Sequence, residues 1–220
     1  MIKAIRSVAR GIWRRWVQPP KPFPGSRNYW TDRYAAGGNS GDGSYNQLAE
    51  FKAETLNHFV QSRTIQSVIE FGCGDGNQLA LARYPTYLGF DVSATAVSLC
   101  RDAFGGDPTK RFELLDDYRG ESAELALSLD VVYHLVEDDV YEEYMGRLFD
   151  SAQRYVIIYS SDIDENPASQ SPHVRHRKFT QWVEEQRPAW RLLVRIPNRY
   201  PLDPATGRGS FADFSIYERT

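Results

Sequence analysis

The segment SVIEFGCGDGN, residues 67–77, most constrains the fold of this 220-residue chain. A short apolar run ends in Glu70, and glycines follow at alternate positions, at Gly72, Gly74 and Gly76. Glycine adopts left-handed backbone conformations at little steric cost and brings no side chain. Such a turn directly after a buried strand predicts that a ligand approaches the main chain closely at this point.

Strand-like and helix-like patterns alternate along most of the chain. Apolar, β-branched runs predict strands at residues 67–71, 86–92, 111–115, 125–135 and 154–160. Helical spacing of apolar residues predicts helices at residues 46–62, 77–84, 93–104, 137–152 and 179–187. Two last strands, 190–196 and 210–219, have no helix between them and should pair antiparallel. The chain is therefore predicted to be α/β, with a doubly wound, mostly parallel sheet that has a reversed C-terminal strand at its edge.

Composition and charge argue against several classes of protein. Hydrophobic residues make up 41% of the chain and charged residues 25%, as in globular domains. The net charge of −3 gives no overall basic field, so we expect no nucleic-acid partner. Only two cysteines, Cys73 and Cys100, are present, which indicates a reducing, cytoplasmic setting. No apolar run reaches the roughly 18 residues that a membrane-spanning helix needs.

The N-terminal residues 1–17, MIKAIRSVARGIWRRWV, carry five basic residues and no acid. Their apolar residues share one helical face and are interleaved with arginines, unlike those of a signal peptide. A helix of this kind lies on an anionic membrane surface, or packs on the domain or on a second subunit, and both interpretations stay open. Four prolines in residues 18–25 predict an extended linker. Residues 1–27 are thus expected to precede one main domain, residues 28–220.

An acid at the end of the second strand adds to the glycine turn. In doubly wound sheets, ligands bind beyond the carboxyl ends of the strands, where the strand order reverses. Asp91 stands there, 21 residues after Glu70, where a carboxylate accepts hydrogen bonds from ribose hydroxyls. A dinucleotide site would need a third glycine at position 77, which is Asn77.

Two stretches, VIEFGCGDGNQLALA at residues 68–82 and YLGFDVSATAV at residues 87–97, resemble the class I S-adenosylmethionine-dependent methyltransferases. In the order of its elements the resemblance covers residues 28–220. It implies a three-layer, seven-stranded sheet and S-adenosylmethionine as the cofactor. It assigns cofactor-binding roles to Glu70, Gly72, Gly74, Gly76, Asp91, Val92, Asp116, Asp117 and Asp130.

The resemblance also divides these roles. Glu70 and the three glycines would surround the methionine part of the cofactor, and Asp91 would hold the ribose. Asp116 or Asp117, after the third strand, would accept from the adenine amino group. Asp130, after the fourth strand, would lie near the transferred methyl group.

Residues 28–45, NYWTDRYAAGGNSGDGSY, resemble a lid found in a subset of these enzymes. Glycine would make this segment mobile, and Trp30 and Arg33 would contact the methyl acceptor. The alternative is a flexible loop without a role in binding.

Two groups near the carboxyl ends of the fourth and fifth strands would complete the acceptor site. His134 is our first candidate for a general base, with Tyr133 beside it; the alternative is a histidine that begins the next helix. The segment 171–179, SPHVRHRKF, is basic and includes His173, Arg175 and His176. His173 is a second catalytic candidate, and Arg175 and His176 would bind an anionic acceptor, unless this segment is only a solvated helix start.

The sequence therefore predicts a methyltransferase that acts on an oxygen of a small molecule or a saccharide, for example a membrane-linked polysaccharide precursor. A protein that binds the cofactor without catalysis and a nicotinamide-dependent oxidoreductase are the alternatives. No metal ligand set is expected, because the histidines and acids lack a tight ligand spacing.

Overall fold

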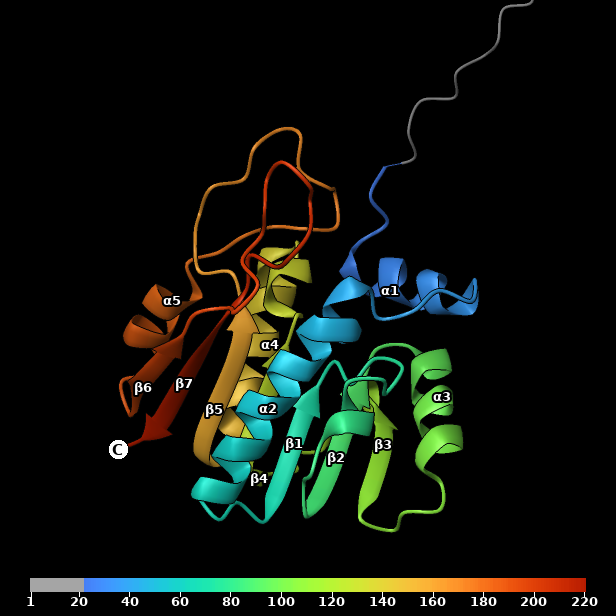
Figure 1. Cartoon of the computed structure of the whole chain (residues 1–220), viewed down its shortest axis with the longest axis vertical. Helices are drawn as coiled ribbons and strands as arrows, with labels where there is room; N and C mark the ends of the chain where they lie inside the picture. Colours follow the sequence, from blue (N-terminus) through green and yellow to red (C-terminus); the bar gives the residue numbers. More distant parts are fainter. Residues whose placement is uncertain (1–21) are drawn as a thin grey trace, which may run out of the picture.

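The computed structural model describes residues 22–220. Its centre is a seven-stranded sheet with the strand order β3-β2-β1-β4-β5-β7-β6, shown in Figure 1. The strands are β1 (Ser67–Phe71), β2 (Thr86–Asp91), β3 (Lys110–Leu114), β4 (Ala123–Leu129), β5 (Ala152–Ser160), β6 (Trp190–Ile196) and β7 (Asp213–Arg219). The predicted helix at residues 1–17 lies outside the described residues.

Helices cover both faces of the sheet. They are α1 (Ser26–Ala35), α2 (Asn46–Ser62), α3 (Ala94–Phe104), α4 (Asp138–Asp150) and α5 (Phe179–Gln186), with short 3₁₀ turns η1 (Asp42–Ser44), η2 (Leu79–Leu81), η3 (Leu115–Asp117) and η4 (Val132–His134). Apolar residues of α2 and α3 pack in one core on one face, and those of α4 and α5 pack in a second core on the other. The predicted three-layer α/β fold is confirmed.

The reversed strand lies one position further inside the sheet than predicted. β7 runs antiparallel to both β5 and β6, so β6 forms the edge. The reason is burial: Phe214 and Ile216 of β7 are at most 1% exposed, whereas Leu192 and Val194 of β6 are 38% and 41% exposed. A strand that is apolar on both faces gains more from a central position.

Two predicted elements end well before their predicted last residues. The predicted helix 77–84 contains only η2, because Asn57 on α2 donates to the Leu81 carbonyl oxygen and accepts from the Arg83 amide. The predicted strand 125–135 ends at Leu129, because Asp130 adopts a left-handed φ of 59° that strand backbone does not allow.

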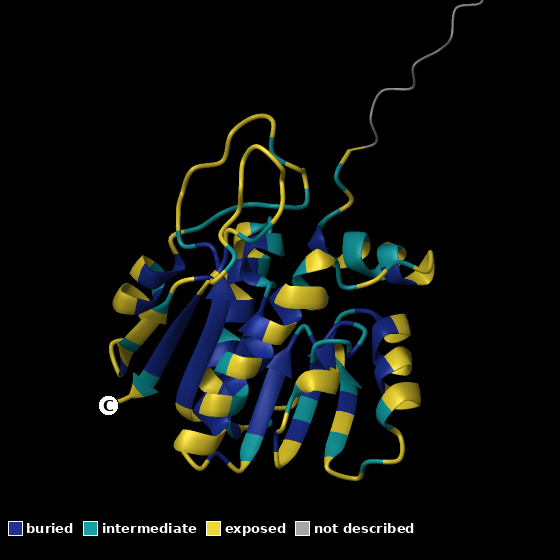
Figure 2. Cartoon of the chain, in the orientation of Figure 1, coloured by how far each residue is buried: buried dark blue, intermediate teal, exposed yellow. Residues whose placement is uncertain are grey.

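The carboxyl ends of the parallel strands lie at one edge of the sheet, covered by α1 and by two long loops (Figure 1). The strand order reverses between β1 and β4, the neighbours at the centre of this edge. Figure 2 shows that the central strands β1, β4, β5 and β7 are largely buried, whereas the two loops above are largely exposed. None of the helices within residues 22–220 is both long and apolar enough to cross a membrane.

Candidate functional site

A cavity of about 240 Å³ lies beyond the carboxyl ends of β1, β2 and β4. This is the switch point of the sheet, where open α/β sheets bind their ligands. Helix α1 and residues 40–44 roof it. Its lining includes eight of the predicted site residues: Trp30, Glu70, Gly72, Gly74, Asp91, Val92, Asp130 and His134.

Gly72 and Gly74 form one wall of the cavity from bare backbone. Their φ angles are 92° and 59°, in the left-handed region that favours glycine. A Cβ atom on Gly72 would lie 2.4 Å from Cγ2 of Val131, and one on Gly74 would lie 2.3 Å from Oγ of Ser40. Any side chain is therefore excluded here. Gly76 does not line the cavity; its Cβ position lies 2.8 Å from the Phe104 ring of α3.

Asp91 ends β2 beside this wall and is 6% exposed. Its Oδ2 accepts from the Gly74 amide at 3.0 Å, and its Oδ1 accepts from the Ser93 amide at 2.9 Å. Burial raises the pKa of Asp91 to about 6, against the opposing effect of these hydrogen bonds. Each oxygen keeps a further lone pair, so the carboxylate can still accept from a ligand.

Glu70 lies on β1 below the turn and is 5% exposed. The Tyr87 hydroxyl donates to its Oε2 at 2.6 Å. Burial raises the pKa of Glu70 to about 7, although the Tyr87 hydrogen bond and the Lys52 charge oppose the rise. Glu70 therefore keeps its proton to a higher pH than an exposed glutamate does.

A buried ion pair, which the sequence analysis did not predict, lies across the cavity. Lys52 of α2 has a fully buried side chain, and its Nζ lies 2.6 Å from Oδ2 of Asp130. The Tyr133 hydroxyl donates to the other oxygen of Asp130 at 2.8 Å. The signal in the sequence was a lysine on an apolar helical stripe, between Leu48 and Leu56 at a spacing of four.

His134 borders the cavity from η4. Its Nδ1 lies 2.9 Å from the carbonyl oxygen of His173. Because a carbonyl only accepts, Nδ1 carries the proton and Nε2 keeps a free lone pair. Burial lowers the pKa of His134 to about 4, so the ring is neutral at physiological pH. A neutral imidazole with this tautomer can take a proton from a bound hydroxyl group.

Aromatic rings surround His134. The His173 ring stacks on it at 5.4 Å between centroids, and Tyr29 stacks on the other side of His173 at 4.4 Å. Trp30 meets His134 edge-on at 4.8 Å. Arg33 lies outside the cavity lining, with its guanidinium carbon 5.6 Å from the centre of the Trp30 ring. His173 thus lies behind His134, where its carbonyl fixes the tautomer.

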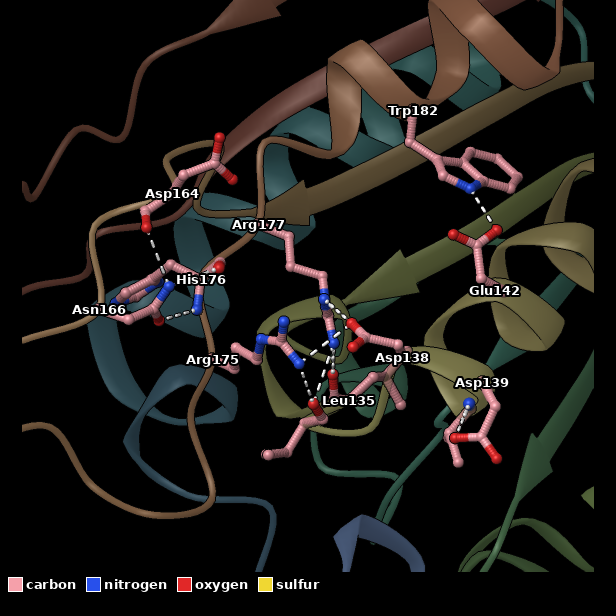
Figure 3. Close-up of polar contacts among 12 residues, drawn as sticks. Leu135, Asp138, Asp139, Glu142, Asp164, Asn166, Arg175, His176, Arg177 and Trp182 are labelled. Carbon is pink, nitrogen blue, oxygen red and sulfur yellow. Dashed lines mark hydrogen bonds and ion pairs between the residues drawn. The ribbon is translucent and has the colours of Figure 1, made fainter.

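The basic segment 171–179 lies beside the start of α4 and does not line the cavity (Figure 3). Arg175 and Arg177 both pair with Asp138, at 3.0 and 2.6 Å. Arg175 also donates to the Val136 carbonyl oxygen, and His176 Nδ1 lies 2.6 Å from the Ser161 hydroxyl. Acceptor binding by Arg175 and His176 stays a prediction, and the pairing with Asp138 neutralises part of the positive charge on which it rests.

Asp116 and Asp117 also lie outside the cavity lining, although the adjacent Leu115 belongs to it. Arg27 of α1 holds Asp116 through two hydrogen bonds, at 2.7 and 3.1 Å. Asp117 is paired with Arg119 at 3.9 Å. The adenine role therefore stays a prediction, and in this structure Asp116 forms an exposed ion pair with α1.

The segment predicted as a lid is a helix, α1, followed by a loop held on the glycine turn. The Asp75 carboxylate accepts from the Ser40 amide at 3.0 Å and from the Tyr45 hydroxyl at 2.7 Å. Burial opposes the charge on Asp75, but these hydrogen bonds outweigh it and lower its pKa. Asn77 also donates to the Ser44 carbonyl oxygen at 2.6 Å. These contacts hold the segment over the cavity, and its movement as a lid stays a prediction.

The residues present fit a nucleoside bearing an amino-acid tail. The walls combine bare backbone, an acid at the end of β2 and Gln78, whose Oε1 is buried and has no hydrogen-bond partner among residues 22–220. Besides Lys52 and Gln78, fourteen lining residues were not among the predicted site residues: Ser26, Arg27, Tyr34, Ser40, Ser44, Cys73, Leu115, Leu129, Val131, Leu135, Val140, Glu143, Tyr144 and Arg147. Half of these fourteen residues come from α1 and α4, which lie far from the glycine turn along the chain and so carry no part of its motif.

Comparison with known proteins rests on structure, since no protein-family model and no curated protein matches the sequence. The N-methyltransferase NodS from Bradyrhizobium japonicum WM9, solved with S-adenosyl-L-homocysteine, has a TM-score of 0.66 at 12% identity, over 89% of this chain and 98% of NodS. Magnesium protoporphyrin IX methyltransferase (ChlM) from Synechocystis PCC 6803, with bound SAH, has a TM-score of 0.61 at 14% identity, over 88% of this chain and 98% of that one.

The methyltransferase domain of bacterial CtHen1-C has a TM-score of 0.61 at 17% identity, over 79% of this chain and 99% of that domain. Each of the three matches spans most of both chains. The chain has the fold of the class I S-adenosylmethionine-dependent methyltransferases.

Proposed function

We propose that this protein is an S-adenosylmethionine-dependent methyltransferase that acts on a hydroxyl group of a small molecule or a saccharide. The observation that carries the proposal is the position of His134. A neutral imidazole with a free Nε2 borders the same cavity as the glycine turn and Asp91. One cavity would thus combine the groups that bind a nucleoside, namely the glycine turn and Asp91, with a base that accepts a proton.

The cofactor part of the proposal is supported by the donor and acceptor groups of the cavity. Gly72 and Gly74 leave backbone free for close approach, and Asp91 keeps lone pairs for ribose hydroxyls. When bound, S-adenosylmethionine would supply an electrophilic methyl group on a sulfonium. NodS and ChlM, which share this fold, were solved with its demethylated product.

The acceptor part is supported by the chemistry of His134. A hydroxyl must lose its proton as its oxygen attacks the methyl group, and a positioned base contributes about 10²–10⁴-fold to such a step. The Trp30 and His173 rings cover part of this base. A saccharide carried on a membrane would also explain the basic residues 1–17, and it is the acceptor class that we propose.

Product formation tests this function. The protein is incubated with S-adenosylmethionine and with sugars, sugar nucleotides and lipid-linked saccharides, and S-adenosylhomocysteine is measured. We expect its formation with a hydroxyl-bearing acceptor and a methyl ether in the product. Cofactor binding without turnover on any of these acceptors would contradict the enzyme proposal and favour a non-catalytic binding protein.

Cofactor affinity should increase as the pH rises through about 6. An ionised Asp91 accepts ribose hydroxyls, whereas a protonated one must first lose its proton, and its pKa in the free protein is about 6. Below that pH, the dissociation constant of S-adenosylhomocysteine should rise by up to about tenfold per pH unit. Isothermal titration calorimetry between pH 5 and 8 measures this.

Glu70, with a pKa of about 7, titrates in the same range, so the control is Asp91→Asn. This variant cannot ionise at position 91 and should bind more weakly, with most of the pH dependence below 6 removed. A pH dependence identical to that of the unsubstituted protein would show that Asp91 does not contact the ligand.

A further inference from the structure

The end of the cavity next to α2 carries two polar groups that the proposed chemistry leaves without a role. They are the ammonium group of Lys52 and the side-chain amide of Gln78. The hydroxyls of Ser40 and Ser44 lie in the same lining. We call these four residues the α2 end of the cavity.

Lys52 has spare hydrogen-bonding capacity. An ammonium group carries three N–H donors. Among residues 22–220, Lys52 Nζ donates to a single acceptor, Oδ2 of Asp130 at 2.6 Å. Its side chain is fully buried, and a buried charge is stable only when it is paired and hydrogen-bonded. A second anionic acceptor at this end of the cavity would use donors that the protein itself leaves free.

Gln78 offers the complementary group. Its Nε2 donates to the Ala49 carbonyl oxygen of α2 at 3.1 Å, which fixes the orientation of the amide. Its Oε1 is buried without a hydrogen-bond partner in the described part of the chain. Gln78 thus contacts α2 three residues before Lys52, and both residues line the cavity.

We propose that Lys52 and Gln78 bind the amino-acid end of the cofactor, with Lys52 donating to its carboxylate and Gln78 Oε1 accepting from its ammonium group. The inference rests on the proposed function. The amino-acid end of the cofactor is a zwitterion. Its carboxylate matches the free donors of Lys52, its ammonium group matches Gln78 Oε1, and the two together add no net charge to the cavity. Asp130, already paired with Lys52 and Tyr133, then keeps its own partners.

A truncated ligand tests the assignment. 5′-Methylthioadenosine has the nucleoside and thioether of S-adenosylhomocysteine but lacks the amino-acid end. Hydrogen bonds to charged groups in such a site correspond to an affinity factor of about 10–100. The unsubstituted protein should therefore bind S-adenosylhomocysteine more tightly than 5′-methylthioadenosine by about this factor in calorimetry.

Lys52→Met should remove most of this preference, and it should leave the affinity for 5′-methylthioadenosine unchanged within about twofold. Because this variant leaves Asp130 buried without its cation, the double variant Lys52→Met/Asp130→Asn removes both charges and should show the same loss. Gln78→Leu should reduce the preference severalfold. Lys178→Met, at an exposed lysine outside the cavity, is the matched control and should keep the full preference.

The outcomes separate the two proposals. If the Lys52 variants weaken both ligands equally, or weaken neither, Lys52 does not bind the amino-acid end, and the cofactor assignment still stands. If the unsubstituted protein binds neither ligand, the proposed function itself is wrong, and this assignment fails with it.

Discussion

Replacing His134 by asparagine is expected to lower kcat for methyl transfer by about 10²–10⁴-fold. Asparagine keeps an N–H donor near the position of Nδ1, which preserves the hydrogen bond to the His173 carbonyl oxygen, but it has no basic nitrogen at Nε2. The affinity for S-adenosylhomocysteine should change by less than about threefold, since base catalysis and cofactor binding use different groups. Initial rates at saturating cofactor, together with calorimetry, measure both effects.

The control is His58→Asn, at an exposed histidine on α2. It should retain full activity. A His134→Asn enzyme with unchanged kcat would exclude this residue as the base. Equal losses of cofactor affinity and turnover would instead assign His134 a structural role beneath Trp30.

Gly74→Val is expected to abolish measurable cofactor binding. The φ angle of 59° is costly for any residue with a Cβ atom, by about 1–2 kcal/mol, and most costly for a β-branched one. The added Cβ would lie 2.3 Å from Oγ of Ser40 and 2.9 Å from Oη of Tyr34. The valine methyl groups would then fill the cavity beside the glycine turn and displace residues 40–44, which cover it. Calorimetry with S-adenosylhomocysteine should detect no saturable heat.

The far-ultraviolet circular dichroism of this variant should stay close to that of the unsubstituted protein, because the turn lies outside the sheet. Gly106→Val is the matched control, since a Cβ atom there meets nothing within 4 Å. It should bind the cofactor normally. Normal binding by Gly74→Val as well would mean that the ligand does not approach the glycine turn.

Local patterns were sufficient to predict most elements. The predicted bounds 46–62, 67–71 and 190–196 coincide with α2, β1 and β6. Ser93, the first residue of the predicted helix 93–104, caps α3, with its hydroxyl accepting from the Ala96 amide. Hydrophobic spacing and capping residues act within one element, so the sequence reports them directly.

Features that depend on residues far apart along the chain could not be predicted from local sequence patterns. The left-handed φ of Asp130, next to the Lys52 ion pair, ends β4 where an apolar run continues to Leu135. The position of β7 between β5 and β6 depends on which strand buries more apolar surface, a property of the whole sheet. Which strands pair with one another decides where a strand lies in the sheet, and the residues of that strand alone carry little information about it.

The candidate site likewise contains residues that local motifs predicted and residues that they did not. Glu70, Gly72 and Gly74 were predicted from the glycine turn and Asp91 from the end of the next strand, and the structure places all four at the cavity, whereas Gly76 of the same turn does not line it. Lys52 was missed because α2 was interpreted as an ordinary amphipathic helix. The roof was expected at residues 28–45, but its fastening by Asp75 depends on a side chain 35 residues beyond Ser40.

Calorimetric titration of S-adenosylhomocysteine into the unsubstituted protein and into Asp91→Ala tests most directly whether this cavity binds an adenosyl cofactor. We predict one ligand per chain with a micromolar dissociation constant for the unsubstituted protein, and a loss of detectable binding in the variant. Absence of saturable binding to the unsubstituted protein at millimolar ligand, or equal binding by Asp91→Ala, would contradict it.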